Sequence, residues 1–206
     1  MKDKILKEVE NYYSEKIRKF GNSPNGVDWN STDGQHLRFQ QLCNVINKAS
    51  FSLLDYGCGY GELINFLEHN GYSDFNYFGY DISPEMIDTA KELFKHKLKV
   101  TFDMNLGQTQ FDYVIASGIF NVTANGINEQ EWLDYILNTL NQMNNLSKHG
   151  YSFNVLTKYS DREFMKDYLY YADPCFLFDY CKQHHSKNVA LLHDYHLYEF
   201  TLIVRK

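Results

Sequence analysis

Two acidic residues beside a glycine-rich turn are the part of this sequence best suited to bind a ligand. Asp55 comes directly before the turn at residues 57–61, and Asp81 ends the strand-like run at 76–80. Glycines let a backbone approach a ligand closely, and an acid at the end of the second strand can accept hydrogen bonds from ribose hydroxyls. An acid at position 55 would repel a pyrophosphate and would suit a cation. The pattern therefore predicts a nucleoside site for a positively charged ligand.

The elements around these acids must follow one another as strand, turn, helix and strand. Residues 51–54 are a short apolar run that predicts a buried strand, and residues 62–69 predict a helix after the turn. A second helix should begin at 83–85, where a serine can cap it, a proline fits its first turn and an acid suits its positive end. Such a βαβ unit would bring Asp55 and Asp81 together at the glycine turn.

The rest of the chain continues to alternate between helical and strand patterns. Further helices are expected at 3–20, from Thr32 or Asp33 to about Lys48, and at 128–146; further strands are expected at 97–102, 111–116, 150–156, 189–192 and 197–204. Residues 161–183 predict a mixed helical insertion that is broken near Asp173 and Pro174. The four-residue connection at 193–196 can join only antiparallel neighbours, so the last strand should run against the others.

Composition narrows the class of protein. The chain has 206 residues, 20 Lys and Arg against 26 Asp and Glu, and a formal net charge of −6. One domain fits this length, and the acidic balance argues against a large nucleic-acid footprint. Residues 1–20 are charged and no run approaches ~18 apolar residues, so neither a secretory leader nor a membrane span is expected. The four cysteines lack zinc-site spacing, which favours a reduced, cytoplasmic protein without a structural metal.

The motifs, taken in order, resemble those of class I S-adenosylmethionine-dependent methyltransferases. The resemblance rests on residues 55–61, 79–87, 102–103 and 111–118, and it extends from about residue 33 to the end of the chain. It implies an α/β fold, in which a Rossmann-like, mostly parallel seven-stranded sheet ends in an antiparallel β-hairpin and carries helices on both faces. It also implies one methyltransferase domain over 1–206. Residues 1–48 would form a helical cap, and the aromatic-rich residues 159–187 would form a cap over the acceptor.

The resemblance assigns roles around S-adenosylmethionine. Asp81 would accept both ribose hydroxyls, and Asp55 would complement the ammonium and sulfonium charges. Asp103 and the Met104 N–H would contact adenine. The full set of implied cofactor-binding residues is Gln35, Arg38, Asp55, Gly57, Cys58, Gly59, Asp81, Ile82, Met86, Asp103, Met104, Ser117 and Gly118.

Several of these roles have equal alternatives. Gln35 and Arg38 would hold the methionine carboxylate, but Arg38 could equally form a surface ion pair. Met86 would sandwich adenine with Ile82, or it could simply belong to the core. Cys58 could be a small packed residue.

A general base for methyl transfer should lie beyond the carboxyl ends of the parallel strands, where ligands of open α/β sheets bind. That rule makes His193 the leading candidate, with Tyr171 and Asp173 as further catalytic candidates in a lid that also includes Tyr170. Tyr12 and Tyr13 could cover the cofactor. For each tyrosine the alternative is ordinary packing, and for His193 it is a turn residue. No metal-ligand cluster is evident, so a metal-free mechanism is expected.

The acceptor is less constrained. After the predicted fourth strand the chain reads Ser-Gly-Ile-Phe-Asn at 117–121, without the Asn/Asp-Pro-Pro-aromatic run of DNA amino-methyltransferases. A resemblance to small methyltransferases of bacterial surface-polysaccharide gene clusters implies O-methylation of a small-molecule, glycan or nucleotide-linked acceptor, such as a capsular sugar or phosphoramidate. A phosphate-bearing acceptor would need basic partners such as Lys158, Arg162, Lys166 or His193.

Two other functions remain open: an NAD-dependent oxidoreductase and a non-catalytic S-adenosylmethionine-binding module. The oxidoreductase is disfavoured because the third glycine of the turn comes one residue early and Asp55 faces the turn. No membrane partner is expected. The sequence leaves the oligomeric state open.

Overall fold

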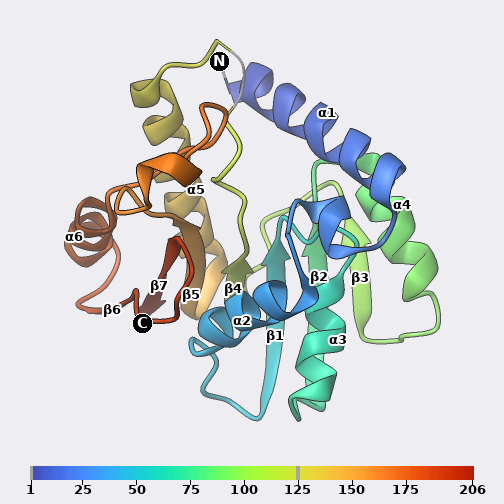
Figure 1. Cartoon of the computed structure of the whole chain (residues 1–206). Helices are drawn as coiled ribbons and strands as arrows, with labels where there is room; N and C mark the ends of the chain where they lie inside the picture. The colour runs from blue at the N-terminus through green and yellow to red at the C-terminus, as the bar shows by residue number, and fades with distance from the viewer. Residues whose placement is uncertain (1, 124–125) are drawn as a thin grey trace.

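A seven-stranded sheet forms the centre of the computed structural model, which describes residues 2–123 and 126–206 (Figure 1). The strands are β1 Ser50–Tyr56, β2 Asp74–Tyr80, β3 Val100–Asp103, β4 Phe111–Ala116, β5 Ser147–Leu156, β6 Asn188–Leu192 and β7 Glu199–Arg205. Their order in the sheet is β3-β2-β1-β4-β5-β7-β6. Neighbours from β3 to β5 are parallel, whereas β7 is antiparallel to both β5 and β6. The predicted mostly parallel sheet with a C-terminal antiparallel hairpin is confirmed.

Helices cover both faces of this sheet and one of its ends. They are α1 Lys2–Phe20, α2 Thr32–Cys43, α3 Glu62–His69, α4 Pro84–Leu93, α5 Glu129–Leu146 and α6 Pro174–His184, with short 3-10 helices η1 Pro24–Val27 and η2 Arg162–Phe164. Apolar residues of α2, α3 and α4 share one buried cluster with the strands, and those of α5 and α6 share the cluster on the other face. Figure 1 shows α1, in blue, crossing above the ends of the central strands. None of the helices in the described part of the chain is long and apolar enough to cross a membrane.

Local capping explains where several helices begin. The Ser83 hydroxyl accepts the Met86 N–H at 3.3 Å, as predicted for the start of α4. The helix predicted to run to about Lys48 instead ends at Cys43. The break predicted near Asp173 and Pro174 is the boundary at which α6 begins: Asp173 accepts the N–H groups of Cys175 and Phe176, and Pro174 occupies the first turn.

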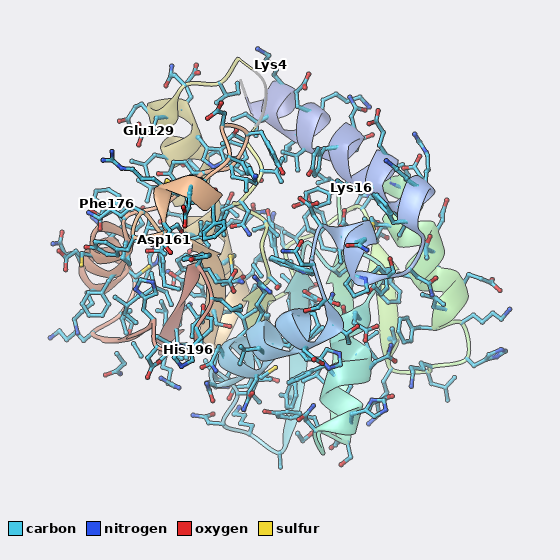
Figure 2. The ribbon with its side chains drawn as sticks, viewed as in Figure 1. Lys4, Lys16, Glu129, Asp161, Phe176 and His196 are labelled. Carbon is cyan, nitrogen blue, oxygen red and sulfur yellow. The ribbon has the colours of Figure 1, made fainter. Side chains whose placement is uncertain are left out.

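The loop between α1 and α2 is tied to α1 through Asp28. Its carboxylate accepts a hydrogen bond from the Tyr12 hydroxyl at 2.7 Å and forms an ion pair with Lys16 at 2.5 Å. Figure 2 shows Lys16 on the side of α1 that faces this loop. The N-terminal segment is therefore fixed as a cover over the end of the sheet.

Candidate active site

A cavity opens at the carboxyl ends of β1, β2 and β4. Strand order reverses between β1 and β4, and ligands of open α/β sheets bind at such a switch point. Segments far apart in the sequence meet there. The lining residues are Val9, Tyr13, Val27, Trp29, Gln35, Phe39, Asp55, Tyr56, Gly57, Cys58, Gly59, Tyr60, Glu62, Tyr80, Asp81, Ile82, Met86, Ser117, Gly118, Ile119 and Tyr135.

The glycine turn after β1 forms the floor of this cavity. The N–H groups of Gly57 and Cys58 both donate to the Tyr80 carbonyl, at 2.7 and 2.9 Å, which folds the turn against the end of β2. Gly57 and Gly59 have positive φ angles of 82° and 53°. A Cβ at Gly57 would stand 2.3 Å from the Ile119 side chain, and one at Gly59 would stand 2.8 Å from Val27. The bare backbone is therefore required by both conformation and space.

Asp81 connects the glycine turn to the start of α4. One carboxylate oxygen accepts the Gly59 N–H at 2.8 Å, and the other accepts the Ser83 N–H at 2.9 Å. Burial raises the pKa of this carboxyl, while the backbone donors act in the opposite direction. Each oxygen keeps a second lone pair, and Asp81 lines the cavity, so the carboxylate can accept hydrogen bonds from a ligand.

Asp55 is the second buried carboxyl of the cavity. The Tyr77 hydroxyl donates to it at 2.6 Å. Burial raises the pKa of Asp55 to about 7; the bond from Tyr77 lowers it, and the nearby Asp81 raises it further. A buried carboxyl in this state gains most from a ligand that brings positive charge.

Two buried polar atoms of the lining have no hydrogen-bond partner in the protein. They are Oε1 of Gln35 and Oγ of Ser117. Buried polar groups are normally paired, so these atoms indicate that the cavity receives a polar ligand. Together with the two carboxylates and the open glycine backbone, they fit the ammonium, carboxylate and ribose groups of S-adenosylmethionine.

The structure brings most of the predicted cofactor-binding residues to this one cavity. Those that line it are Gln35, Asp55, Gly57, Cys58, Gly59, Asp81, Ile82, Met86, Ser117 and Gly118. Met86 is also core, since it packs with Ile17 and Tyr60. Tyr13 lines the cavity as expected, whereas Tyr12 is turned to Asp28.

Asp103 and Met104 do not line the cavity. Asp103 accepts the backbone N–H of Asn105 at 2.8 Å and its side-chain amide at 3.2 Å, and Met104 is exposed. The reason lies in the sheet order: β3 is an edge strand, and β2 separates its end from β1.

Arg38, which was predicted to hold the methionine carboxylate, is also not part of the lining. Its Nε donates to the buried carboxylate of Glu199 at 2.9 Å, and its guanidinium lies 4.0 Å from the centre of the Trp29 ring. Trp29 in turn lies on Gly118, where a Cβ would come within 2.5 Å of the indole. Arg38 thus holds a wall of the cavity in place and does not enter it. Arg38 does form an ion pair, but a buried one and not the surface pair of the alternative.

The residues predicted as catalytic lie outside the cavity. His193 is exposed and contacts the rings of Tyr159 and Phe200. Asp173 caps α6 and pairs with Lys158 at 2.6 Å, and the Tyr171 hydroxyl accepts the Lys166 N–H. His193 does follow a strand at the expected edge, but β6 is the outermost strand, and β7 and β5 separate it from β4.

Sequence reasoning missed residues that only the fold brings to the cavity. Tyr56, Tyr80 and Tyr135 line it, as does Trp29 from the loop before α2. Tyr56 and Tyr80 stand directly beside the predicted glycine turn and Asp81, so their positions in the motifs were the available signal. Glu199 and Asn154 were also missed; Asn154 donates to Glu199 and accepts the Gly118 N–H.

A parallel sheet in this order, with an antiparallel hairpin and a cavity beside the glycine turn, defines the class of Rossmann-like methyltransferases. Residues 54–150 match a family model described as a methyltransferase domain. The chain is 48% identical over 164 residues to Rv1506c of Mycobacterium tuberculosis, a protein named as a methyltransferase, covering 79% of this chain and 98% of the relative. The chain belongs to the class I S-adenosylmethionine-dependent methyltransferase family, whose methyl donor is S-adenosylmethionine.

Solved structures share this fold at low sequence identity. A methyltransferase from Aquifex aeolicus, described as SAM-dependent, superposes with a TM-score of 0.61 at 14% identity, covering 93% of this chain and 97% of the other. The N-methyltransferase NodS from Bradyrhizobium japonicum gives a TM-score of 0.64 at 10% identity, covering 97% and 98%.

Proposed function

We propose that this protein binds S-adenosylmethionine in the cavity and transfers its methyl group to a small acceptor. Asp81 would hold the ribose, and Asp55 would lie near the ammonium and sulfonium charges. Gln35 and Ser117 would pair with polar groups of the methionine part, and Ile82 and Met86 would flank adenine. The observation that carries the proposal is the meeting of both acids, the glycine turn and the two unpaired polar atoms in one cavity.

When bound, S-adenosylmethionine supplies an activated methyl group on a good leaving group. The chain's own contribution is then alignment and exclusion of water. Tyr13 and Val9 of α1 and Trp29 of the following loop line the cavity and cover the strand ends. Attraction between the Asp55 carboxylate and the positive charge of the cofactor would hold the cofactor in place.

Calorimetric titration tests this assignment. We expect the demethylated product, S-adenosylhomocysteine, to bind in the micromolar range and NAD to give no heat. Heat with NAD but none with S-adenosylhomocysteine would reassign the protein to nicotinamide chemistry. Tight cofactor binding without turnover on any acceptor would favour the non-catalytic module instead.

The raised pKa of Asp55 makes cofactor affinity depend on pH. In the free protein this carboxyl has a pKa of about 7, and a bound cation should lower it. Below pH 7, binding must therefore expel a proton, whereas above it the carboxylate is already charged. We expect the dissociation constant of S-adenosylhomocysteine to be nearly constant above neutrality. At one pH unit below the pKa of Asp55 in the free protein, it should be about tenfold larger.

Asp55→Asn is the matched variant for this pH series. It keeps the shape of the side chain and the neighbouring Tyr77, but it cannot ionise. The affinity of this variant for S-adenosylhomocysteine should be lower than that of the parent protein. It should also be nearly independent of pH between 5.5 and 8, as measured by the same calorimetry. A pH dependence that persists in the variant would exclude Asp55 as its source.

For the acceptor, a small molecule remains part of the proposal, but a phosphate group on it is disfavoured. Of the described residues, no Lys, Arg or His lines the cavity. The basic residues suggested for a phosphoramidate or nucleotide-linked acceptor, Lys158, Arg162, Lys166 and His193, all lie outside it. The lining therefore supports an acceptor without phosphate.

His193 supplies a further test of the site. Because its ring lies outside the cavity against Tyr159 and Phe200, His193→Ala should leave the turnover rate within about twofold of the parent, in contrast to the expectation for a general base. The check is the initial rate of S-adenosylhomocysteine formation. A drop of a hundredfold or more with unchanged cofactor affinity would restore His193 as the base.

We also propose that residues 1–206 work as one methyltransferase domain in the cytoplasm. Residues 1–48 support this by supplying Tyr13, Trp29 and Gln35 to the cavity. Residues 159–187 supply none of the described lining, so their role as an acceptor cap rests on the resemblance alone. The four cysteines are free thiols, which suits a reducing compartment.

A further inference from the structure

Four tyrosines form one wall of the cavity, and we call them the tyrosine wall: Tyr13, Tyr56, Tyr80 and Tyr135. They come from α1, the ends of β1 and β2, and α5. The rings of Tyr56 and Tyr80 lie 5.0 Å apart, and all four are only partly buried in the protein. Ile119 and Val9 also line the cavity. The tyrosine wall is not among the proposed cofactor contacts, which include Asp55, the glycine turn and Asp81.

All charged side chains that line the cavity in the described chain are acidic: Asp55, Glu62 and Asp81. A second hollow adjoins the tyrosine wall, because Tyr135 lines both. The Tyr56 hydroxyl also donates to Gln142 of this second hollow at 3.2 Å. The charged residues that line this second hollow are Glu131 and Asp134, and no Lys, Arg or His of the described chain lines it. Both hollows thus favour a positively charged ligand over a negatively charged one.

The tyrosine wall also lacks a group that could take a proton from an alcohol. Burial raises the pKa of the Tyr135 phenol to about 12, and it raises those of Tyr13, Tyr56 and Tyr80 as well. The phenols therefore stay protonated at neutral pH and act as hydrogen-bond donors. An amine enters as its ammonium form at neutral pH and must first lose one proton to water. The neutral amine then has a free lone pair, and it is a stronger nucleophile than an alcohol that has kept its proton.

We propose that the acceptor is an amine nitrogen carried by an apolar or aromatic group that lies on the tyrosine wall. This inference rests on the proposed methyltransferase function. The amine lone pair forms the new N–C bond while the C–S bond breaks and its electrons return to sulfur. The nitrogen becomes positively charged, and a primary or secondary amine then releases its proton to water. Faces of aromatic rings stabilise such a cation, most strongly when it is desolvated.

The decisive measurement compares two probes of nearly equal shape and different charge. Choline carries a quaternary ammonium, and 3,3-dimethylbutan-1-ol has an uncharged carbon in its place. Each is titrated calorimetrically into protein saturated with S-adenosylhomocysteine. We expect choline to bind at least about tenfold more tightly, as one cation–π site would give. Equal affinity, or tighter binding of the neutral alcohol, would overturn the amine assignment.

Variants of Tyr135 locate the effect. Tyr135→Phe keeps the ring and should preserve the preference for choline, whereas Tyr135→Leu should reduce it. Tyr80→Leu serves the same purpose if the Tyr135 variant does not fold, and Tyr159→Leu, at an exposed ring outside the cavity, is the control. A preference that survives the loss of either wall ring would place the cation elsewhere and refute the proposal.

An independent test compares the rates of methyl transfer to 2-phenylethylamine and to 2-phenylethanol. The amine alone should yield S-adenosylhomocysteine, and methylation of the alcohol would contradict the inference. If neither reacts, the choline comparison decides. Absence of cofactor binding in the titration described above would instead refute the proposed function, so the two failures are distinguishable.

Discussion

Asp81→Ala is expected to weaken S-adenosylhomocysteine binding by about tenfold to a hundredfold, the largest effect on the cofactor site. The variant removes the charged acceptor proposed for the ribose hydroxyls. It also leaves the N–H groups of Gly59 and Ser83 without the partners that now lie 2.8 and 2.9 Å away. Since hydrogen bonds to charged groups contribute about 1.5–3 kcal/mol each, the ligand contacts alone account for this range. Calorimetric dissociation constants provide the measurement.

Asp74→Ala is the matched control, because Asp74 begins the same strand at its opposite end and pairs with Lys99 on the surface. Asp74→Ala should bind S-adenosylhomocysteine as tightly as the parent protein does. Asp81→Asn, which keeps one carbonyl acceptor, should fall between the two. A parent-like dissociation constant for Asp81→Ala would refute the ribose role and, with it, the placement of the cofactor.

Arg38→Ala is expected to cause the largest loss of stability, about 3 kcal/mol in the free energy of unfolding. The variant leaves Glu199 as a buried carboxylate without its cation: the Glu199 side chain is 0% exposed and that of Arg38 only 12%. Trp29 also loses the guanidinium that lies 4.0 Å from its ring centre. In a chain of this size the melting temperature should fall by about 6–12 °C, as scanning calorimetry would show.

Lys95→Ala is the control for this variant, since Lys95 forms an exposed ion pair with Glu92 and should change stability by less than about 0.5 kcal/mol. Glu199→Ala should resemble Arg38→Ala, because it leaves a largely buried guanidinium unpaired. Equal melting temperatures for Arg38→Ala and Lys95→Ala would show that the buried pair does not hold this part of the fold.

Local patterns predicted the elements that depend on near neighbours in the chain. The β1–turn–α3–β2 unit, the start of α4 at Ser83 and the final hairpin all follow from turn, capping and connection rules, which act over a few residues. Two predicted site residues that do not line the cavity have positions that depend on the lateral order of the strands. Asp103 and His193 do follow strands at the expected edge, yet β3 and β6 are the outer strands of the sheet. Distance from the centre of a sheet is not encoded in any local pattern.

The class of fold and the two acids beside a bare glycine turn could be read from local spacing, because strand, turn, helix and strand follow one another within one βαβ unit. What surrounds the ligand depends on how distant elements pack. The tertiary structure turned Arg38 away to Glu199, joined Tyr13 and Tyr135 in the tyrosine wall, and left the lining without a described basic residue. These partners are far apart in the chain, and they meet only because α1 packs across the strand ends while α5 covers one face of the sheet.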